Sequence, residues 1–144
     1  MMKKILIILL IFVLVVASVL FITRRTATIE FFETNKTKTI RMETNTFIVE
    51  FPTDYIKARI GDEVEISFDI KILKNTTVYF LTKIVPIGVG CEADKFMLEH
   101  SDIVKVRFKV YESANIGEVY KIWLTVEDDL GNSVDIWMNI EVIS

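Results

Sequence analysis

The end of the chain, residues 119–142, consists of two runs in which apolar and polar side chains alternate. Alternation with a period of two is what a half-buried strand requires, because successive side chains point to opposite faces of a sheet. The turn between the runs is rich in Asp, Gly and Asn, which are common turn formers. Pairing the runs symmetrically about Leu130 creates one apolar face, with Tyr120, Ile122, Leu124 and Val126 opposite Ile140, Met138, Ile136 and Val134. The sequence therefore predicts a β-hairpin and its register.

Shorter runs with the same character precede this hairpin. Alternation is clear in 63–73 and 103–111, whereas 77–85 is apolar on both faces and is predicted to be a central strand. Two more short strands are predicted at 46–51 and 55–60, on either side of a Pro-Thr-Asp turn. Turns recur about every 8 to 12 residues, which is typical of an antiparallel sandwich. We therefore expect an all-β, antiparallel β-sandwich of seven or eight strands.

The N-terminal segment has a different pattern. Ile5 to Ile22 contains no charged residue, and it is bracketed by Lys3-Lys4 and Arg24-Arg25. As a helix it would span about 27 Å, close to the roughly 30 Å of a bilayer's hydrocarbon core. The small-residue pattern of a secretory cleavage site is poor here. We therefore expect a single-pass membrane anchor over 5–22, in preference to a removed signal peptide or a pilin-type helix.

The distribution of charge separates this anchor from the rest. The first 25 residues hold four of the 17 basic residues and none of the 20 acidic ones, so residues 26–144 carry a formal charge of −7. An acidic body argues against nucleic acid as a partner, since such binding needs clustered Lys and Arg. It favours export of the C-terminal domain. We divide the chain into an anchor (1–25), a stalk with a candidate edge strand near 28–33 (26–45), and the sandwich (46–144).

Cysteine and histidine each occur once, which excludes a disulfide framework and a zinc-finger spacing. No set of nucleophile, base and metal ligands is recognisable, so the sequence predicts neither catalysis nor a cofactor. Cys91 is a candidate for an intermolecular disulfide, because an odd thiol in an exported chain invites pairing. A buried or simply free thiol is the alternative.

The closing hairpin resembles a known class. Gly117-Glu118-Val119-Tyr120, the run Leu124 to Asn132, and Ile140-Glu141-Val142 are similar to the last hairpin of prokaryotic immunoglobulin-like surface modules, such as the PKD-like and CARDB-like families. The full PKD motif and the antibody Cys-Trp-Cys framework are missing. An anchor followed by such a sandwich is similar to archaeal cell-surface proteins. The resemblance implies that the antiparallel sandwich is immunoglobulin-like. It also implies adhesion, scaffolding or polymer assembly rather than catalysis.

Trp123 and Trp137 oppose one another in the predicted register, on the face away from the apolar one. Three interpretations follow. The pair could only staple the hairpin, since cross-strand aromatic pairs stabilise a sheet by roughly 0.2–1 kcal/mol. It could be covered by an earlier strand or the stalk. It could also be an exposed contact patch, because Trp is enriched at binding hot spots.

Two other kinds of site have weaker signals. Asp128, Asp129 and Asn132 gather oxygen atoms in one turn, as a calcium loop does, but the usual Asp spacing is absent and these residues are common turn formers. Asn35 and Asn75 each begin an Asn-x-Thr triplet in a predicted loop, the acceptor pattern for glycosylation.

These observations lead to one expected function with two alternatives. We expect a non-catalytic binding or structural module of the cell surface, anchored in the cell membrane with its C-terminal domain outside the cytoplasm. The alternatives are a pilin-like or filament-associated subunit, whose apolar helix packs in a filament core, and an accessory subunit of a membrane complex. The expected partners are the membrane itself and another surface or membrane protein, or further copies of the same chain.

Overall fold

The structure is a computed structural model that describes residues 7–16 and 38–144. These residues belong to two compact units, Met1–Thr37 and Lys38–Ser144. In the first unit residues 7–16 form a helix of about 15 Å. Among the described residues no helix is long and apolar enough to cross a membrane. The rest of the predicted anchor and the candidate edge strand near 28–33 lie outside the described residues.

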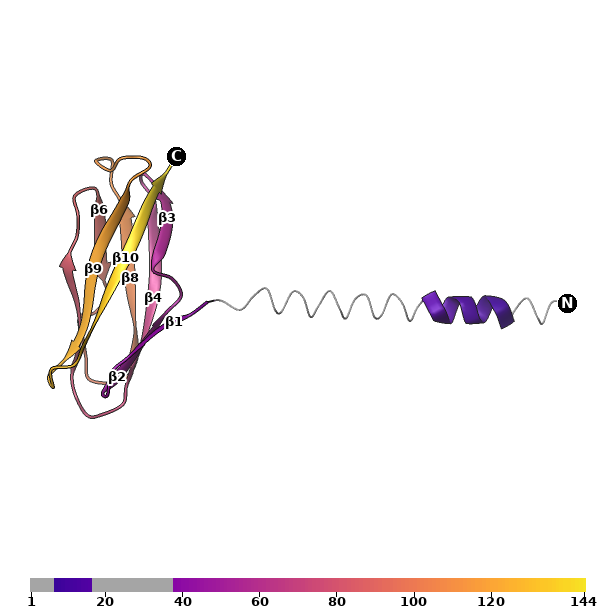
Figure 1. The fold of residues 1–144 in the computed structure, drawn as a ribbon, viewed down its shortest axis with the longest axis horizontal. Coiled ribbons are helices and arrows are strands. Elements are labelled where there is room, and N and C mark those ends of the chain that lie inside the picture. Colours follow the sequence, from indigo (N-terminus) through magenta and orange to yellow (C-terminus); the bar gives the residue numbers. More distant parts are fainter. Residues whose placement is uncertain (1–6, 17–37) are drawn as a thin grey trace. The chain divides into compact units, whose positions relative to one another are not determined.

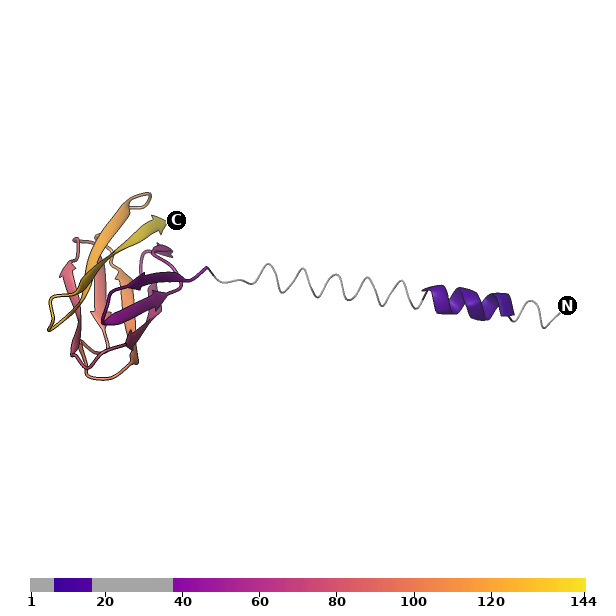
Figure 2. The same cartoon turned by 60° about the horizontal axis from the view of Figure 1, so that its bottom comes forward.

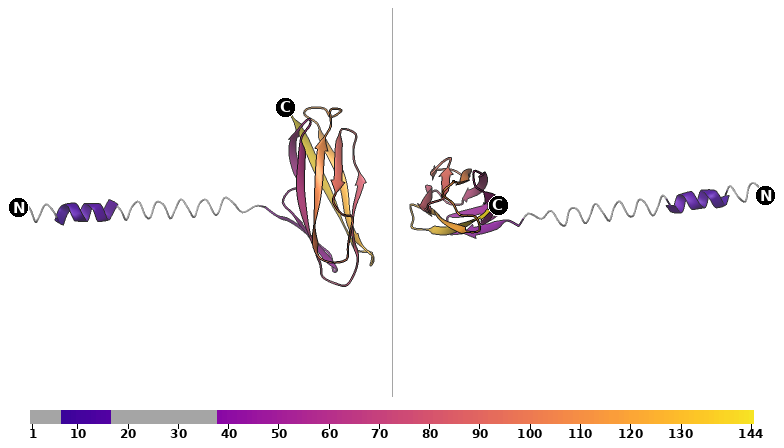
Figure 3. Two further views of the ribbon diagram at one scale, coloured as in Figure 1. Left: turned by 180° about the vertical axis from the view of Figure 1, so that it is seen from behind. Right: turned by 90° about the horizontal axis from the view of Figure 1, so that it is seen from above.

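The second unit contains two five-stranded sheets that pack face to face (Figure 1). The first sheet, in the order β1-β2-β4-β8-β6, consists of β1 (Ile40–Glu43), β2 (Phe47–Phe51), β4 (Glu63–Ile72), β8 (Asp102–Val110) and β6 (Val89–Ala93). The second sheet, in the order β3-β10-β9-β5-β7, consists of β3 (Tyr55–Arg59), β10 (Ser133–Ile143), β9 (Val119–Asp128), β5 (Val78–Ile84) and β7 (Met97–Leu98). The two layers are also clear from behind and from above (Figure 3).

The order of the strands identifies the type of sandwich. An immunoglobulin-like domain places strands A, B, E and D in one sheet and C, F and G in the other. Here β2, β4, β8 and β6 have the first set of positions, and β5, β9 and β10 have the second. The predicted immunoglobulin-like β-sandwich is therefore confirmed at the level of its architecture. One pair departs from the antiparallel pattern, because β3 runs parallel to β10.

The register predicted for the closing hairpin is confirmed. Ile122 pairs with Met138 and Leu124 with Ile136, and the apolar side chains of both strands are buried between the sheets. On the opposite face Trp123 pairs with Trp137. The alternation of the sequence was sufficient here, because a shift by one residue would have exposed the whole apolar set.

The described residues form ten strands, where the sequence predicted seven or eight. The three strands absent from the prediction are β1, β6 and β7. Strand β1 forms a hairpin with β2 at the side of the sandwich (Figure 2), and the compact unit begins at Lys38, before the predicted start at residue 46. Strand β7 has only two residues, too few for any alternation to be visible.

Strand β5 is not the central strand that its apolar sequence predicted. It pairs along its length with β9, but its other neighbour is the two-residue β7. The second half of β5 is consequently exposed, and Ile84 has half of its surface in solvent. The continuous apolar pattern reflects side chains on the outside of the sheet as well as in the core.

The core lies between the two sheets, and all of its described residues belong to the second unit. Three phenylalanines connect the layers: Phe51 and Phe68 of the first sheet have ring centroids 5.0 Å apart, and Phe68 lies 5.2 Å from Phe80 of the second sheet. Because residues 38–144 contain this core and both five-stranded sheets, we expect them to fold without the N-terminal segment.

Candidate binding face

The outer face of the first sheet carries paired charges. Arg107 of β8 lies 3.6 Å from Glu63 of β4 and 3.2 Å from Glu92 of β6, and Lys109 also contacts Glu63, at 3.6 Å. A further ion pair connects Arg41 of β1 to Glu50 of β2. Exposed pairs of this kind contribute little stability, but they satisfy each other's charge and remain hydrated. This face has the character of an ordinary solvated surface.

The outer face of the second sheet is different, because it carries both tryptophans. Their rings are stacked, with centroids 5.4 Å apart and an angle of 16° between the planes. Trp123 is partly buried, whereas 48% of the surface of Trp137 is exposed. No described strand covers the pair. Of the three interpretations of the sequence, covering by an earlier strand is not seen among the described strands, and most of the stalk lies outside the described residues. Stapling and contact are both compatible with the geometry.

Other apolar side chains extend this pair across the sheet. A β-bulge in β5 brings Ile84 opposite Trp123, so that Ile84, Trp123 and Trp137 form one row across three strands. We call this row the indole row. Leu81 of β5 and Met97 of β7 lie on the same face, and Met97 is exposed. Sequence reasoning missed Ile84 and Met97, because neither the bulge nor β7 has a recognisable pattern.

Asp135 fixes the position of the indole row. Its Oδ1 atom accepts hydrogen bonds from Nε1 of Trp123 at 3.0 Å and from Oγ1 of Thr125 at 2.9 Å. The indole N–H of Trp123 is thereby satisfied within the protein. Both bonds fall on the same oxygen of Asp135, which leaves Oδ2 for another donor.

The turn of the closing hairpin is built around Asp128, one of the three weak metal candidates. Its Oδ1 accepts hydrogen bonds from the backbone N–H groups of Leu130 and Asn132, both at 2.9 Å. Its Oδ2 accepts one from the side chain of Asn132 and one from the hydroxyl of Thr46. Burial alone would raise the pKa of the Asp128 carboxyl, but these hydrogen bonds outweigh it and hold the pKa below its ordinary value.

The third candidate, Asp129, accepts a hydrogen bond from Tyr79, and this bond raises the pKa of that phenol. Within 7–16 and 38–144 no group of three or more His, Cys, Asp or Glu side chains is arranged to hold a metal ion. The carboxylates of Asp128 and Asp129 have hydrogen-bond partners within the protein, as expected for structural turn residues.

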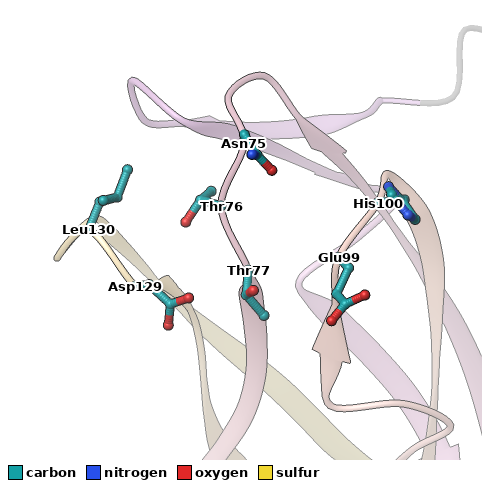
Figure 4. Close-up of a pocket in the computed structure, with 7 residues that line it drawn as sticks. All are labelled: Asn75, Thr76, Thr77, Glu99, His100, Asp129 and Leu130. Atoms are coloured by element: carbon teal, nitrogen blue, oxygen red, sulfur yellow. The ribbon is translucent and has the colours of Figure 1, made fainter.

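A polar pocket of about 490 Å³ lies at the end of the sandwich that holds this turn. Figure 4 shows its lining, which comes from three loops: Asn75, Thr76 and Thr77, then Glu99 and His100, then Asp129 and Leu130. Asn75 is exposed, so its glycosylation triplet is accessible and its use stays a prediction. Asn35 lies outside the described residues.

Cys91 lies in β6 and packs partly against the core. Its Sγ atom is 4.0 Å from Oγ1 of Thr82. Burial raises the pKa of the Cys91 thiol to about 11. A thiol with so high a pKa is a weak nucleophile at neutral pH, because only the thiolate reacts. These surroundings disfavour the intermolecular disulfide, which no observation tests directly. His100, the single histidine of the sequence, lines the polar pocket.

Exposed apolar side chains also gather in loops at the opposite end of the sandwich. Ile87 of the β5–β6 loop and Ile116 of the β8–β9 loop expose 89% and 61% of their surfaces. Ile60 of the β3–β4 turn and Tyr111, just after β8, are exposed in the same way. We call these four residues the apolar loop end.

Comparisons with known proteins give no family for the chain. No protein-family model matches it, and no protein with a curated description matches it. It is similar to the structure of a Bacteroides ovatus GH5 xyloglucanase in complex with a XXXG heptasaccharide, with a TM-score of 0.46 and 14% identity over 67% of this chain and 19% of the xyloglucanase.

It is also similar to the BIgI domain of beta protein from S. agalactiae bound to CEACAM1, with a TM-score of 0.42 and 16% identity over 66% of this chain and 96% of that domain. Both TM-scores are below 0.5, so the immunoglobulin-like fold is assigned from the order and pairing of the strands.

Proposed function

We propose that this protein is a non-catalytic binding module of the cell surface, anchored in the membrane by residues 5–22 and contacting its partner through the indole row. The observation that carries the proposal is the contrast between the two outer faces. On the first sheet Arg107 and Lys109 pair with Glu63 and Glu92, whereas on the second sheet no described strand covers the stacked tryptophan pair.

Physical chemistry favours this face over the apolar loop end. Tryptophan is enriched among residues whose truncation costs the most binding energy, because it buries a large area with few rotatable bonds. Trp123 and Trp137 project from the middle of paired strands, and Asp135 holds Trp123 in one orientation. A contact built on strands is positioned more accurately than one built on loops.

The anchor is supported by the N-terminal segment. All side chains of the helix at residues 7–16 are apolar and exposed, an arrangement that water penalises and lipid accommodates. The uncharged stretch continues on both sides, from Ile5 to Ile22, between basic pairs that can extend to the headgroups. The acidic charge of residues 26–144 and the resemblance of the closing hairpin to prokaryotic surface modules support an extracytoplasmic domain.

Site-directed photocrosslinking of the full chain in its native membranes tests the binding face. A photoreactive phenylalanine derivative replaces Ile84 in the indole row, Glu65 on the outer face of the first sheet, or Ile116 at the apolar loop end. We expect a discrete adduct from position 84, and none from position 65. An adduct from position 116 alone would show that the loops, not the sheet, make the contact.

A matched pair of variants sharpens this test. Trp137→Ala in the chain with the probe at position 84 should abolish the adduct. Tyr111→Ala removes an aromatic side chain of the same exposure, 49% against 48%, and should leave the adduct unchanged. The anchor is tested by alkaline extraction of the membranes and by the mature N-terminus: a soluble chain that starts near Thr26 would exclude it.

A further inference from the structure

Charge on the outer face of the second sheet is divided by the indole row. Towards the β9–β10 turn lie two acidic residues, Glu127 and Asp135. On the other side of the row the charged residues are mostly basic: Lys57, Arg59, Lys121 and one acid, Glu141. Within β3, β9 and β10 the two halves of the face therefore carry formal charges of −2 and +2.

Several of these charges have no ion-pair partner in the part of the chain that the structure describes. The carboxylate of Glu141 already has two partners: Nζ of Lys57 lies 3.8 Å away, and the hydroxyl of Tyr55 donates a hydrogen bond to it at 2.6 Å. Among the described residues the side chains of Lys121, Arg59 and Glu127 form no ion pair. A face with an apolar centre and unpaired charges of opposite sign on its two sides is suited to a complementary surface.

We propose that the partner bound at this face is a second copy of the same chain. This inference rests on the proposed function, in which the indole row is the contact. In a two-fold dimer each surface must be complementary to itself. A two-fold axis that runs along the indole row, across the strands, places the acidic half of each copy over the basic half of the other. Asp135 of one copy then lies over Asn139 and beside Lys121 of the second copy.

The geometry selects one axis. A two-fold axis parallel to the strands would place acidic half over acidic half, which is repulsive. With the axis along the indole row, Ile84, Trp123 and Trp137 meet their own counterparts. Two sheets that pack face to face lie about 10 Å apart, so side chains from both can interdigitate. Because the stacked rings cover part of each other's faces, they offer edges for such packing rather than a flat platform for a planar ligand.

Sedimentation equilibrium of residues 38–144 tests the dimer, at concentrations up to the millimolar range that tethering to a common membrane can supply. We expect a reversible dimer that Trp137→Ala weakens by about 100-fold, because the truncation removes two hot-spot residues from one contact. Tyr111→Ala should leave the dimer unchanged. A chain that stays monomeric throughout, or a dimer that Trp137→Ala does not weaken, would overturn the proposal.

Charge reversal tests the direction of the axis. Lys121→Glu and Glu127→Lys each neutralise one half of the face, so that neither variant can form a homodimer with an attractive contact. We expect each to dimerise about tenfold more weakly than the native chain at low salt. An equimolar mixture keeps one native contact and should form heterodimers more readily than either variant alone. Equal dissociation constants for the mixture and the separate variants would exclude this axis.

The crosslinking experiment separates this inference from the proposed function. An adduct from position 84 with twice the mass of the chain supports both. An adduct of another mass leaves the indole row as the contact and rejects the second copy as its occupant. Failure to crosslink at position 84 rejects both.

Discussion

The hydroxyl of Thr46 donates a hydrogen bond to Oδ2 of Asp128, although the two residues are 82 positions apart in the chain. Thr46 precedes β2 of the first sheet and Asp128 ends β9 of the second. Both side chains are buried. This bond connects the first hairpin of the sandwich to the last one, and it joins the two sheets at the end that carries the polar pocket.

Replacing Thr46 by Val should lower the free energy of unfolding by about 1.5–3 kcal/mol, since a buried hydrogen bond to a charged group is lost and the carboxylate is left with one partner fewer. Urea denaturation of residues 38–144 measures the change. Thr82→Val is the matched control, because the Thr82 side chain is exposed and has only a distant contact with Cys91. A loss at Thr46 no larger than at Thr82 would mean that the bond contributes nothing.

The stability contributed by Asp128 should depend on pH. Its pKa in the folded protein is lower than the ordinary value of 3.8, so the folded state favours the ionised carboxylate. That stability is fully present above the ordinary pKa and is lost as the pH falls through the folded value. The difference in unfolding free energy between the native chain and Asp128→Asn should therefore be constant near neutral pH and shrink below about pH 4. Asp54→Asn, on an exposed turn, serves as the control.

The stacked tryptophans should be energetically coupled. A double-mutant cycle with Trp123→Ala and Trp137→Ala is expected to give a coupling energy of about 0.5–1.5 kcal/mol, the usual range for aromatic pairs in contact. The sequence has no other tryptophan, so the far-ultraviolet circular dichroism should show an exciton couplet that either single variant removes. Additive energies together with an unchanged spectrum would contradict the stack.

Cys91 should react slowly with alkylating reagents in the folded protein. Its raised pKa, about 11, means that only a very small fraction is thiolate at pH 8, and partial burial restricts access further. The rate of reaction with iodoacetamide should keep rising with pH up to about 11. Unfolding in urea should restore the rate of an ordinary thiol. A rate that levels off near pH 8.5 would show that the thiol is solvated. That result would again favour an intermolecular disulfide at Cys91.

Much of the fold follows from local pattern. In β9 and β10 the alternation of side chains specified both the strands and their register, because only one register buries Ile122, Leu124, Ile136 and Met138 together. Residues such as Asp128 and Asn132 marked the turn correctly, since their short side chains bond to nearby backbone groups. Strands β1, β6 and β7 escaped prediction because they are short or contain glycine, so no period can be measured over them.

The candidate binding face was predictable only in part. The sequence placed Trp123 and Trp137 opposite each other, but a period of two shows which side chains share a face and not what covers that face. Whether the indoles are exposed depends on which strands flank β9 and β10, and those neighbours, β5 and β3, come from distant parts of the chain. Ile84 joined the row through a β-bulge, which shifts the register by an amount that the sequence does not show.

The sequence by itself therefore determined the all-β class, the closing hairpin and the apolar character of residues 5–22, because each depends on side chains that are close together along the chain. Tertiary structure alone decided that β3 crosses to the second sheet, that Thr46 meets Asp128, that Cys91 is shielded, and that no described strand covers the indole row. These features depend on contacts between residues far apart in the chain, whose formation is set by the packing of the two sheets and not by any local preference.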